Sequence, residues 1–248
     1  MKKLSIILVI ISFCFAGCKK LGSDEFRISG TIVNGENKYV YINEMTPEGF
    51  LPMDTISIDE KGKFNIKMKY KEAKILILQT NDNNYITLIP NGGEDIKIHG
   101  YFNSLSASYK VENSPQSELL HTLNQEYIKT NAVLSEMRQT LHDNKFADNL
   151  DEIKKEILDQ YNLLEIRQRE VIKSFLQENK GSLACIIALY RKFDNHFLFS
   201  LKSDLDIYES VYQELNKTFP NNQHTLGLKT LIDKTKRILE EDYSQSNF

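Results

Sequence analysis

The stretch VENSPQSELL, residues 111–120, divides the sequence into two halves of different periodicity. Before it, apolar residues recur at every second position, as in β-strands; after it, they recur at every third or fourth position, as in helices. Ser114 followed by Pro115 is typical of a helix start, because Ser caps free N–H groups and Pro fits the first turn. We therefore predict an α+β protein: an N-terminal antiparallel β-sandwich or barrel over residues 26–113, an all-helical region over 114–243 and a polar tail over 244–248.

The β half shows the alternation in seven or eight short segments. The first places Phe26, Ile28 and Ile32 between polar residues and ends at the turn signal Asn34-Gly35. Later segments repeat the pattern, and runs rich in Gly, Asn and Asp separate them. Many short strands at close spacing favour an antiparallel sandwich or a barrel.

The C-terminal half predicts five helices. Two long apolar stripes, interrupted near Asn144, indicate a long antiparallel helical hairpin. A third, mostly apolar helix is expected over 183–193, after the break at Gly181-Ser182. The last two helices are expected from a capping box at Ser203 and Asp206 to before Pro220, and from about Thr225 to Glu241.

The N-terminus carries the features of a bacterial lipoprotein. Lys2 and Lys3 precede an apolar run that ends at Phe15, shorter than the ~20 residues that span a membrane, so it is typical of a secretory signal peptide. Ala16-Gly17-Cys18 resembles the lipobox, in which the Cys is lipidated, for example with palmitate, and the preceding peptide is removed. We expect residues 1–17 to be the signal peptide and 18–25 a lipid-anchored tether; the alternative is a plain signal peptide with an incidental Cys.

These features predict a cell-envelope protein whose partner is a membrane, reached through the lipid on Cys18. We expect an outer-membrane location facing the periplasm or the cell surface. With Cys14 removed and Cys18 lipidated, Cys185 is the remaining thiol, and the sequence has no CxxC, so dithiol catalysis by this chain alone is excluded. Cys185 lies in an apolar run and is interpreted as a buried hydrophobe rather than a reactive thiol. The net charge of −3 argues against a nucleic-acid partner.

Motifs that carry chemistry are absent from the sequence. It has no HExxH, P-loop, GxGxxG or GxSxG, and no two histidines stand three or four residues apart. We therefore predict no catalytic residue, cofactor or metal site; a zinc site built from distant histidines is the alternative. The histidines are His99, His121, His142, His196 and His224.

Three further features have both a binding and a structural interpretation. Residues 81–84 are an oxygen-rich calcium loop or a hairpin turn, and the lack of a calcium loop's Gly and distal Glu favours the turn. A lysine-rich strand face is interpreted either as a binding surface for an anionic partner or as the protection of a strand edge against pairing. Nearby acidic residues favour edge protection. The tyrosines of the β half are interpreted either as a surface that stacks on a sugar or as members of cross-strand side-chain pairs. The side chains concerned are Lys63, Lys67, Lys69 and Lys71, and Tyr39, Tyr41, Tyr85 and Tyr101.

Six short motifs of the β half resemble the N-terminal domain of unknown function found in Bacteroidetes-type envelope lipoproteins. They are Phe26-x-Ile28-x-Gly30-x-Ile32, Tyr39-Val40-Tyr41-Ile42, Asp54-Thr55-Ile56, Gly62-Lys63-Phe64, the Gly-rich turn before Asp95-Ile96, and Val111-Glu112-Asn113-Ser114. In that family a helical segment and then a thioredoxin-like oxidoreductase domain follow. Residues 178–184 are similar to a motif that is common in that helical segment, although Lys180 replaces the usual Pro. The sequence contains no counterpart of the thioredoxin-like domain or its CxxC, so the resemblance carries over no catalytic residue.

The resemblance and the missing motifs lead to three functional hypotheses. The first is a non-enzymatic, membrane-anchored lipoprotein that acts as a binding or scaffold module. The second, implied by the domain context of the family, is an accessory of an envelope thiol–disulfide system that works with a separate thioredoxin-like partner. The third, suggested by the tyrosines of the β half, is a glycan-binding protein at the cell surface.

Overall fold

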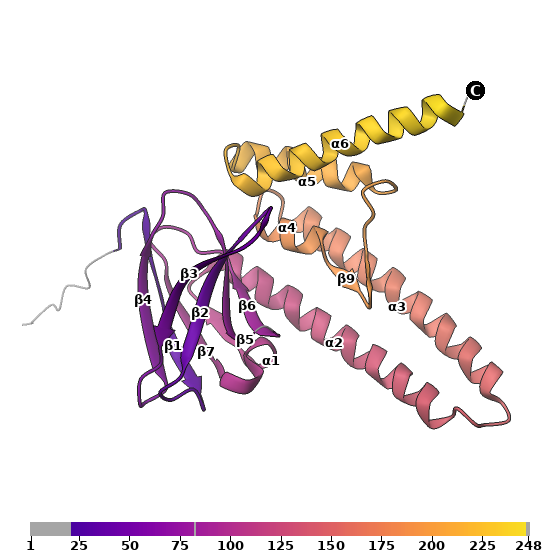
Figure 1. Cartoon of the computed structure of the whole chain (residues 1–248), viewed down its shortest axis with the longest axis horizontal. Coiled ribbons are helices and arrows are strands. Elements are labelled where there is room, and N and C mark those ends of the chain that lie inside the picture. Colours follow the sequence, from indigo (N-terminus) through magenta and orange to yellow (C-terminus); the bar gives the residue numbers. More distant parts are fainter. Residues whose placement is uncertain (1–20, 82, 247–248) are drawn as a thin grey trace, which may run out of the picture.

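The computed structural model describes residues 21–81 and 83–246. The expected signal peptide, Cys18 and Asp82 lie outside these residues. The chain forms a β-rich half followed by a helical half, with two long helices running side by side away from the strands (Figure 1). The predicted α+β class is confirmed.

The β half contains eight strands and two short helical segments. The strands are β1 (Glu25–Val33), β2 (Tyr39–Thr46), β3 (Gly49–Ser57), β4 (Lys63–Lys69), β5 (Ile75–Asn81), β6 (Asn84–Leu88), β7 (Asp95–Tyr101) and β8 (Lys110–Glu112). Between β7 and β8 lie η1 (Phe102–Ser104) and α1 (Leu105–Ser108). The strands form two separate four-stranded sheets, in the orders β4-β1-β7-β8 and β3-β2-β5-β6. The two sheets share one apolar core, so the sandwich and not the closed barrel is correct.

One strand pair differs from the antiparallel prediction. β1 pairs with β7 in parallel, whereas the other pairs in both four-stranded sheets are antiparallel. The chain between β1 and β7 passes through the second sheet, and this long crossover permits parallel pairing without a hairpin. Gly30 permits the close approach of the two strands, because a Cβ atom there would lie 1.8 Å from the carbonyl oxygen of Ile98.

The helical half begins at Ser114, as predicted, and its first two helices form the predicted antiparallel hairpin (Figure 1). Its helices are α2 (Pro115–Asp143), α3 (Leu150–Glu178), α4 (Ala184–Leu189), α5 (Leu205–Thr218) and α6 (Gln223–Ser246). α6 is longer than predicted and continues past Ser244, where the polar tail was expected. The predicted capping box is not formed: Asp204 takes the N-cap position of α5, and Ser203 Oγ donates a hydrogen bond to its carboxylate.

The third helix is shorter than the predicted span 183–193. α4 ends at Leu189, and a small hairpin follows, made of β9 (Lys192–Phe193) and β10 (His196–Phe197). Asp194 adopts a left-handed conformation with φ of 52°, which Asp tolerates in tight turns. The reversal turns Phe193 back onto Tyr161 of α3, with ring centroids 5.0 Å apart. Burial of this ring against α3 replaces the last helical turn.

The helical half packs on the outer face of the second sheet. All four residues from Ile75 to Leu78 are buried, because the core between the two sheets covers one face of β5 and the helices cover the other. Ser117 Oγ accepts a hydrogen bond from the Ile89 amide at 3.0 Å, and Asn222 Nδ2 donates to the Ala73 carbonyl at 2.8 Å. The two halves are therefore joined by an apolar core and by polar contacts.

Candidate functional site

A cavity of about 550 Å³ lies where the two halves meet. Its walls come from the outer face of β6, the segment around α1, one face of α2 and the end of α4. Its size falls within the roughly 300–1,000 Å³ of small-molecule sites. Among the residues that the structure describes, its lining contains Arg and Lys but no Asp or Glu. The cavity is therefore lined by apolar, aromatic, amide and cationic groups.

Four local structures place the polar side chains of the cavity. Tyr85 points outward from β6, and Tyr109 follows α1. Tyr127 and Asn131 lie one turn apart on the same face of α2. Arg191 follows α4, where its carbonyl accepts a hydrogen bond from the Leu198 amide at 3.0 Å and so fixes the start of the β9–β10 hairpin.

Arg191 is a cation without an anionic partner. No carboxylate of the described residues lies within ion-pair distance of it, and its buried Nε atom has no hydrogen-bond partner there. Its guanidinium lies over the ring of Tyr127, 4.6 Å from the centroid. Burial lowers the pKa of Arg191, while Tyr127, Tyr85 and Tyr109 act in the opposite direction. Because guanidinium keeps its proton at neutral pH, the cavity holds a half-buried positive charge.

The tyrosines around Arg191 present free hydroxyl groups. The hydroxyls of Tyr85, Tyr109 and Tyr127 form no hydrogen bond with another described residue. Tyr109 is only 3% exposed, and burial raises its pKa, so its hydroxyl remains a donor at neutral pH. Its ring packs edge-on against His121 with centroids 4.8 Å apart, and His121 Nε2 lies 3.0 Å from its carbonyl oxygen. The arrangement supplies donors for an anion but no paired nucleophile and base.

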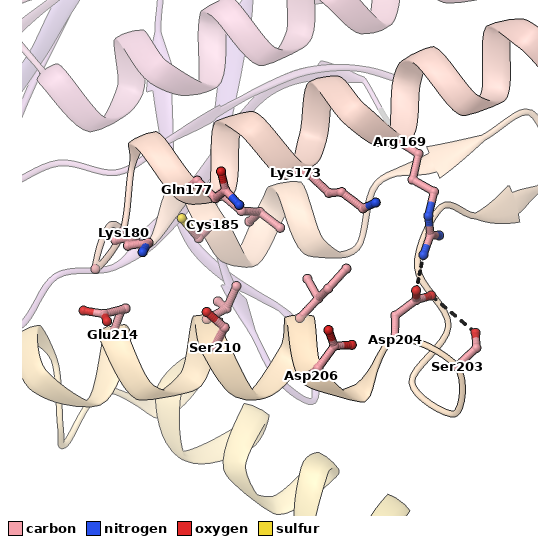
Figure 2. A pocket seen from close by; sticks show the side chains of 14 residues that line it. Arg169, Lys173, Gln177, Lys180, Cys185, Ser203, Asp204, Asp206, Ser210 and Glu214 are labelled. Carbon is pink, nitrogen blue, oxygen red and sulfur yellow. Dashed lines mark hydrogen bonds and ion pairs between the residues drawn. The ribbon is translucent and has the colours of Figure 1, made fainter.

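A second hollow, a groove of about 480 Å³, lies between α3 and α5. Basic side chains of α3 and the following turn face acidic side chains of α5 across it (Figure 2). The basic ones are Arg169, Lys173 and Lys180, and the acidic ones are Asp204, Asp206 and Glu214. Most of these charges are matched within the chain: Lys173 pairs with Glu170 at 2.8 Å and Glu214 with Lys217 at 2.9 Å.

Arg169 in this groove contrasts with Arg191. Its guanidinium donates to the Asp204 carboxylate and to the Leu198 carbonyl, and it lies 4.6 Å from the Phe199 ring centroid. The Asp204 carboxylate also accepts from the Ser200 amide at 2.8 Å. Arg169 is therefore a structural residue that fastens the segment before α5 onto α3, whereas Arg191 has no such partner.

Cys185 lines the same groove but is buried, as predicted from its apolar surroundings. Its Sγ donates to the Asn179 carbonyl at 3.2 Å. Burial raises the pKa of the thiol to about 11. The thiolate, which is the nucleophile, is therefore scarce at neutral pH.

The histidines stand apart from one another. Among the described residues, no group of three or more His, Cys, Asp or Glu side chains is placed to hold a metal ion. His196 contacts Glu165 at 2.8 Å, and His224 is buried where α6 meets the sheet. His99 and His142 are exposed.

Asn81 ends β5 and Asn84 begins β6, and the two residues pair in the antiparallel ladder, as the turn interpretation predicts. Asn84 points inward: its Nδ2 donates to Thr80 Oγ1 and to the Phe102 carbonyl, both at 2.7 Å. Its Oδ1 accepts from the Ser106 amide at 2.9 Å, which holds α1 beside the cavity. The contribution of Asn84 is therefore structural.

Lys63, Lys67 and Lys69 of the lysine-rich face lie on β4, an edge strand, as the protective interpretation predicts, and Lys71 follows the strand. Lys67 pairs with Glu25 at 2.8 Å and Lys69 with Asp24 at 3.2 Å, so neighbouring acids reduce the positive charge of this face. The four singled-out tyrosines do not form one platform. Tyr85 lines the Arg191 cavity, whereas Tyr39, Tyr41 and Tyr101 are exposed and do not line it.

Sequence reasoning missed Arg191. It lies inside the span predicted as the third helix, where a single Arg after an apolar run resembles an ordinary helix end. The cavity is formed by segments distant in sequence, so no local motif marks it. In the sequence, the cavity is indicated only by Tyr85, Tyr109 and Tyr127, which do not recur at a regular interval.

None of the helices in residues 21–81 and 83–246 is long and apolar enough to cross a membrane. No curated protein and no solved structure matches the chain. Residues 26–120 match the family described as "Domain of unknown function (DUF4369)". The match begins in β1 and ends in the first turns of α2, so it covers the whole sandwich. The match confirms, over residues 26–120, the suspected domain of unknown function.

Proposed function

We propose that this protein is a lipid-anchored lipoprotein of the cell envelope that binds a small ligand without transforming it. The observation that carries the proposal is the partnerless Arg191 in a cavity of about 550 Å³. Arg191 is half-buried, and its Nε atom is buried without a hydrogen-bond partner among the described residues. Leaving a buried donor unpaired costs free energy, so a ligand that accepts from it accounts for its presence. The lipobox-like Cys18 supports the anchor, and the lack of a paired nucleophile and base in the cavity supports binding rather than turnover.

Retention of a ligand tests the binding role. The full chain is purified in mild detergent, and native mass spectrometry compares it with Arg191→Met and with the control Arg167→Met, which alters an exposed Arg of α3. We expect a bound small molecule on the unaltered chain and on Arg167→Met, but not on Arg191→Met. Equal retention by all three chains, or none by any, contradicts the proposal.

Metabolic labelling with an alkyne fatty acid tests the anchor. We expect label on the unaltered chain in the membrane fraction and none on Cys18→Ser. Label that persists on Cys18→Ser contradicts the lipoprotein assignment. Crosslinking in living cells followed by capture of the tagged protein addresses the thiol–disulfide alternative: reproducible recovery of a thioredoxin-like protein in place of a small ligand favours that role.

A further inference from the structure

We propose that the Arg191 cavity takes a singly charged organic carboxylate with an apolar or aromatic body, held by the Arg191 guanidinium and by tyrosine hydroxyls. This inference rests on the proposed function and names its ligand class. It follows from the charge, the donors and the walls of the cavity.

The positive charge of the cavity is matched by a ligand with one negative charge. Arg191 is half-buried and is the less exposed of the two cations that line the cavity among the described residues. Lys192 also lines the cavity but is exposed, and its ammonium lies 5.0 Å from the Phe197 ring centroid. A phosphate monoester carries close to two charges at neutral pH and would leave one of them poorly matched. A monoanion is therefore the better fit.

The donors of the cavity fit a carboxylate. Guanidinium is planar and pairs with the two oxygens of a carboxylate through parallel N–H bonds. The guanidinium of Arg191 forms no hydrogen bond with the described residues, and stacking over Tyr127 holds its plane. Tyr85, Tyr109 and Tyr127 supply O–H donors nearby, and the Asn131 amide, one turn beyond Tyr127, is also free of hydrogen bonds with described residues.

The remaining walls fit an apolar body. Aliphatic side chains from the sheet and the helices complete the lining. They include Met45, Ile86, Leu120, Ile128, Ile186 and Ile187. Within residues 21–81 and 83–246, no acidic side chain lines the cavity to repel an anion or to bind an amine. A strongly hydrated sugar would leave most of its hydroxyls facing these apolar groups without partners. The walls therefore favour an aromatic or aliphatic acid over a neutral glycan.

Matched pairs of probes test the inference. Isothermal titration uses the full chain in phosphatidylcholine nanodiscs with 4-phenylbutyrate and its amide, octanoate and its amide, glucuronate and inorganic phosphate. We expect at least one apolar carboxylate to bind ~10-fold or more tightly than its amide, because a hydrogen bond to a charged group is worth about 1.5–3 kcal/mol and 1.4 kcal/mol is tenfold. The two pairs decide between an aromatic and an aliphatic body.

Two variants separate the role of the guanidinium from folding. Arg191→Met is expected to lose the preference for the carboxylate, and Arg191→Lys, which keeps the charge but not the planar fork, to show about a tenfold loss. Thermal unfolding checks that both remain folded, and Arg167→Met is expected to bind as the unaltered chain does. Equal affinity for acid and amide, or unchanged binding by Arg191→Met, overturns the inference.

The failures of the two proposals are distinguishable. If a retained small molecule is lost in Arg191→Met but is neutral or phosphorylated, the binding function stands and the carboxylate assignment is wrong. If no probe binds and no molecule is retained, both are wrong.

Discussion

The contact between Glu44 and Lys74 offers a quantitative test of a buried ion pair beside the junction of the two halves. Glu44 lies on β2 and is only 3% exposed. Both of its carboxylate oxygens lie 2.6 Å from Lys74 Nζ, and Gln223 Nε2, at the start of α6, donates to one of them at 2.7 Å. The hydrogen bond from Gln223 to Glu44 thus joins the second sheet to the last helix, and Lys74 neutralises the Glu44 carboxylate at that junction.

The perturbation is Lys74→Met, which keeps the apolar stem and removes the ammonium. Removing one partner of a buried ion pair costs about 3–5 kcal/mol, because the other charge remains buried. The Lys74 side chain is 23% exposed and Gln223 still donates to Glu44, so we expect the lower end, about 3 kcal/mol. In a chain of this size that loss lowers Tm by roughly 6–12 °C.

The double variant Glu44→Met with Lys74→Met removes both charges. We expect it to lie within about 1 kcal/mol of the unaltered chain, since apolar replacement of a buried pair is often neutral. Lys71→Met, in the same exposed loop, is the control and should change nothing measurable.

Urea unfolding followed by far-ultraviolet circular dichroism gives the free energies. A loss below about 0.5 kcal/mol for Lys74→Met, which is no more than an ordinary surface substitution causes, refutes the reasoning. A double variant as unstable as the single one refutes it as well.

Three further predictions concern single residues. Burial lowers the pKa of His224 below its ordinary 6.5, so below that pH the unfolded chain binds the proton more readily than the folded chain does. We therefore expect Tm to fall as the pH is lowered from 7.5 to 5.5. The fall should be less steep in His224→Gln than in the control His99→Gln, which alters an exposed histidine. Cys185, with its pKa raised to about 11 from an ordinary 9, should react with iodoacetamide at pH 8 at least ~100-fold more slowly folded than in urea, and equal rates would contradict its burial. Gly30→Ala should cost at least about 3 kcal/mol, because the added Cβ collides with the Ile98 carbonyl; a urea midpoint near that of the unaltered chain would count against the parallel β1–β7 pair.

Much of the fold could be predicted because burial repeats with the period of each element. The alternation of Phe26, Ile28 and Ile32 marks the inner face of β1, and the stripe containing Leu120, Leu123, Leu134 and Met137 marks the buried face of α2. These patterns are local and survive in any tertiary context that buries one face. The helix start at Ser114-Pro115 is equally local.

Features that depend on long-range contacts could not be predicted. The parallel pairing of β1 with β7 is a matter of topology, and the reversal at Asp194 is stabilised by Phe193 packing on Tyr161, a residue of another helix. The burial of Glu44 depends on Lys74 and on Gln223, which lies 179 positions away. The Arg191 cavity belongs to this class, since its walls come from both halves of the chain.

The central claim is that the Arg191 cavity is a ligand site, and a crystal structure of the full chain with 4-phenylbutyrate tests it most directly. Our account predicts the carboxylate on the Arg191 guanidinium, with N···O distances of ~2.7–2.9 Å, and the phenyl ring between Tyr127 and the aliphatic wall. A structure in which the ligand lies elsewhere, or in which the Arg191 guanidinium pairs with a carboxylate of the chain itself, would contradict it.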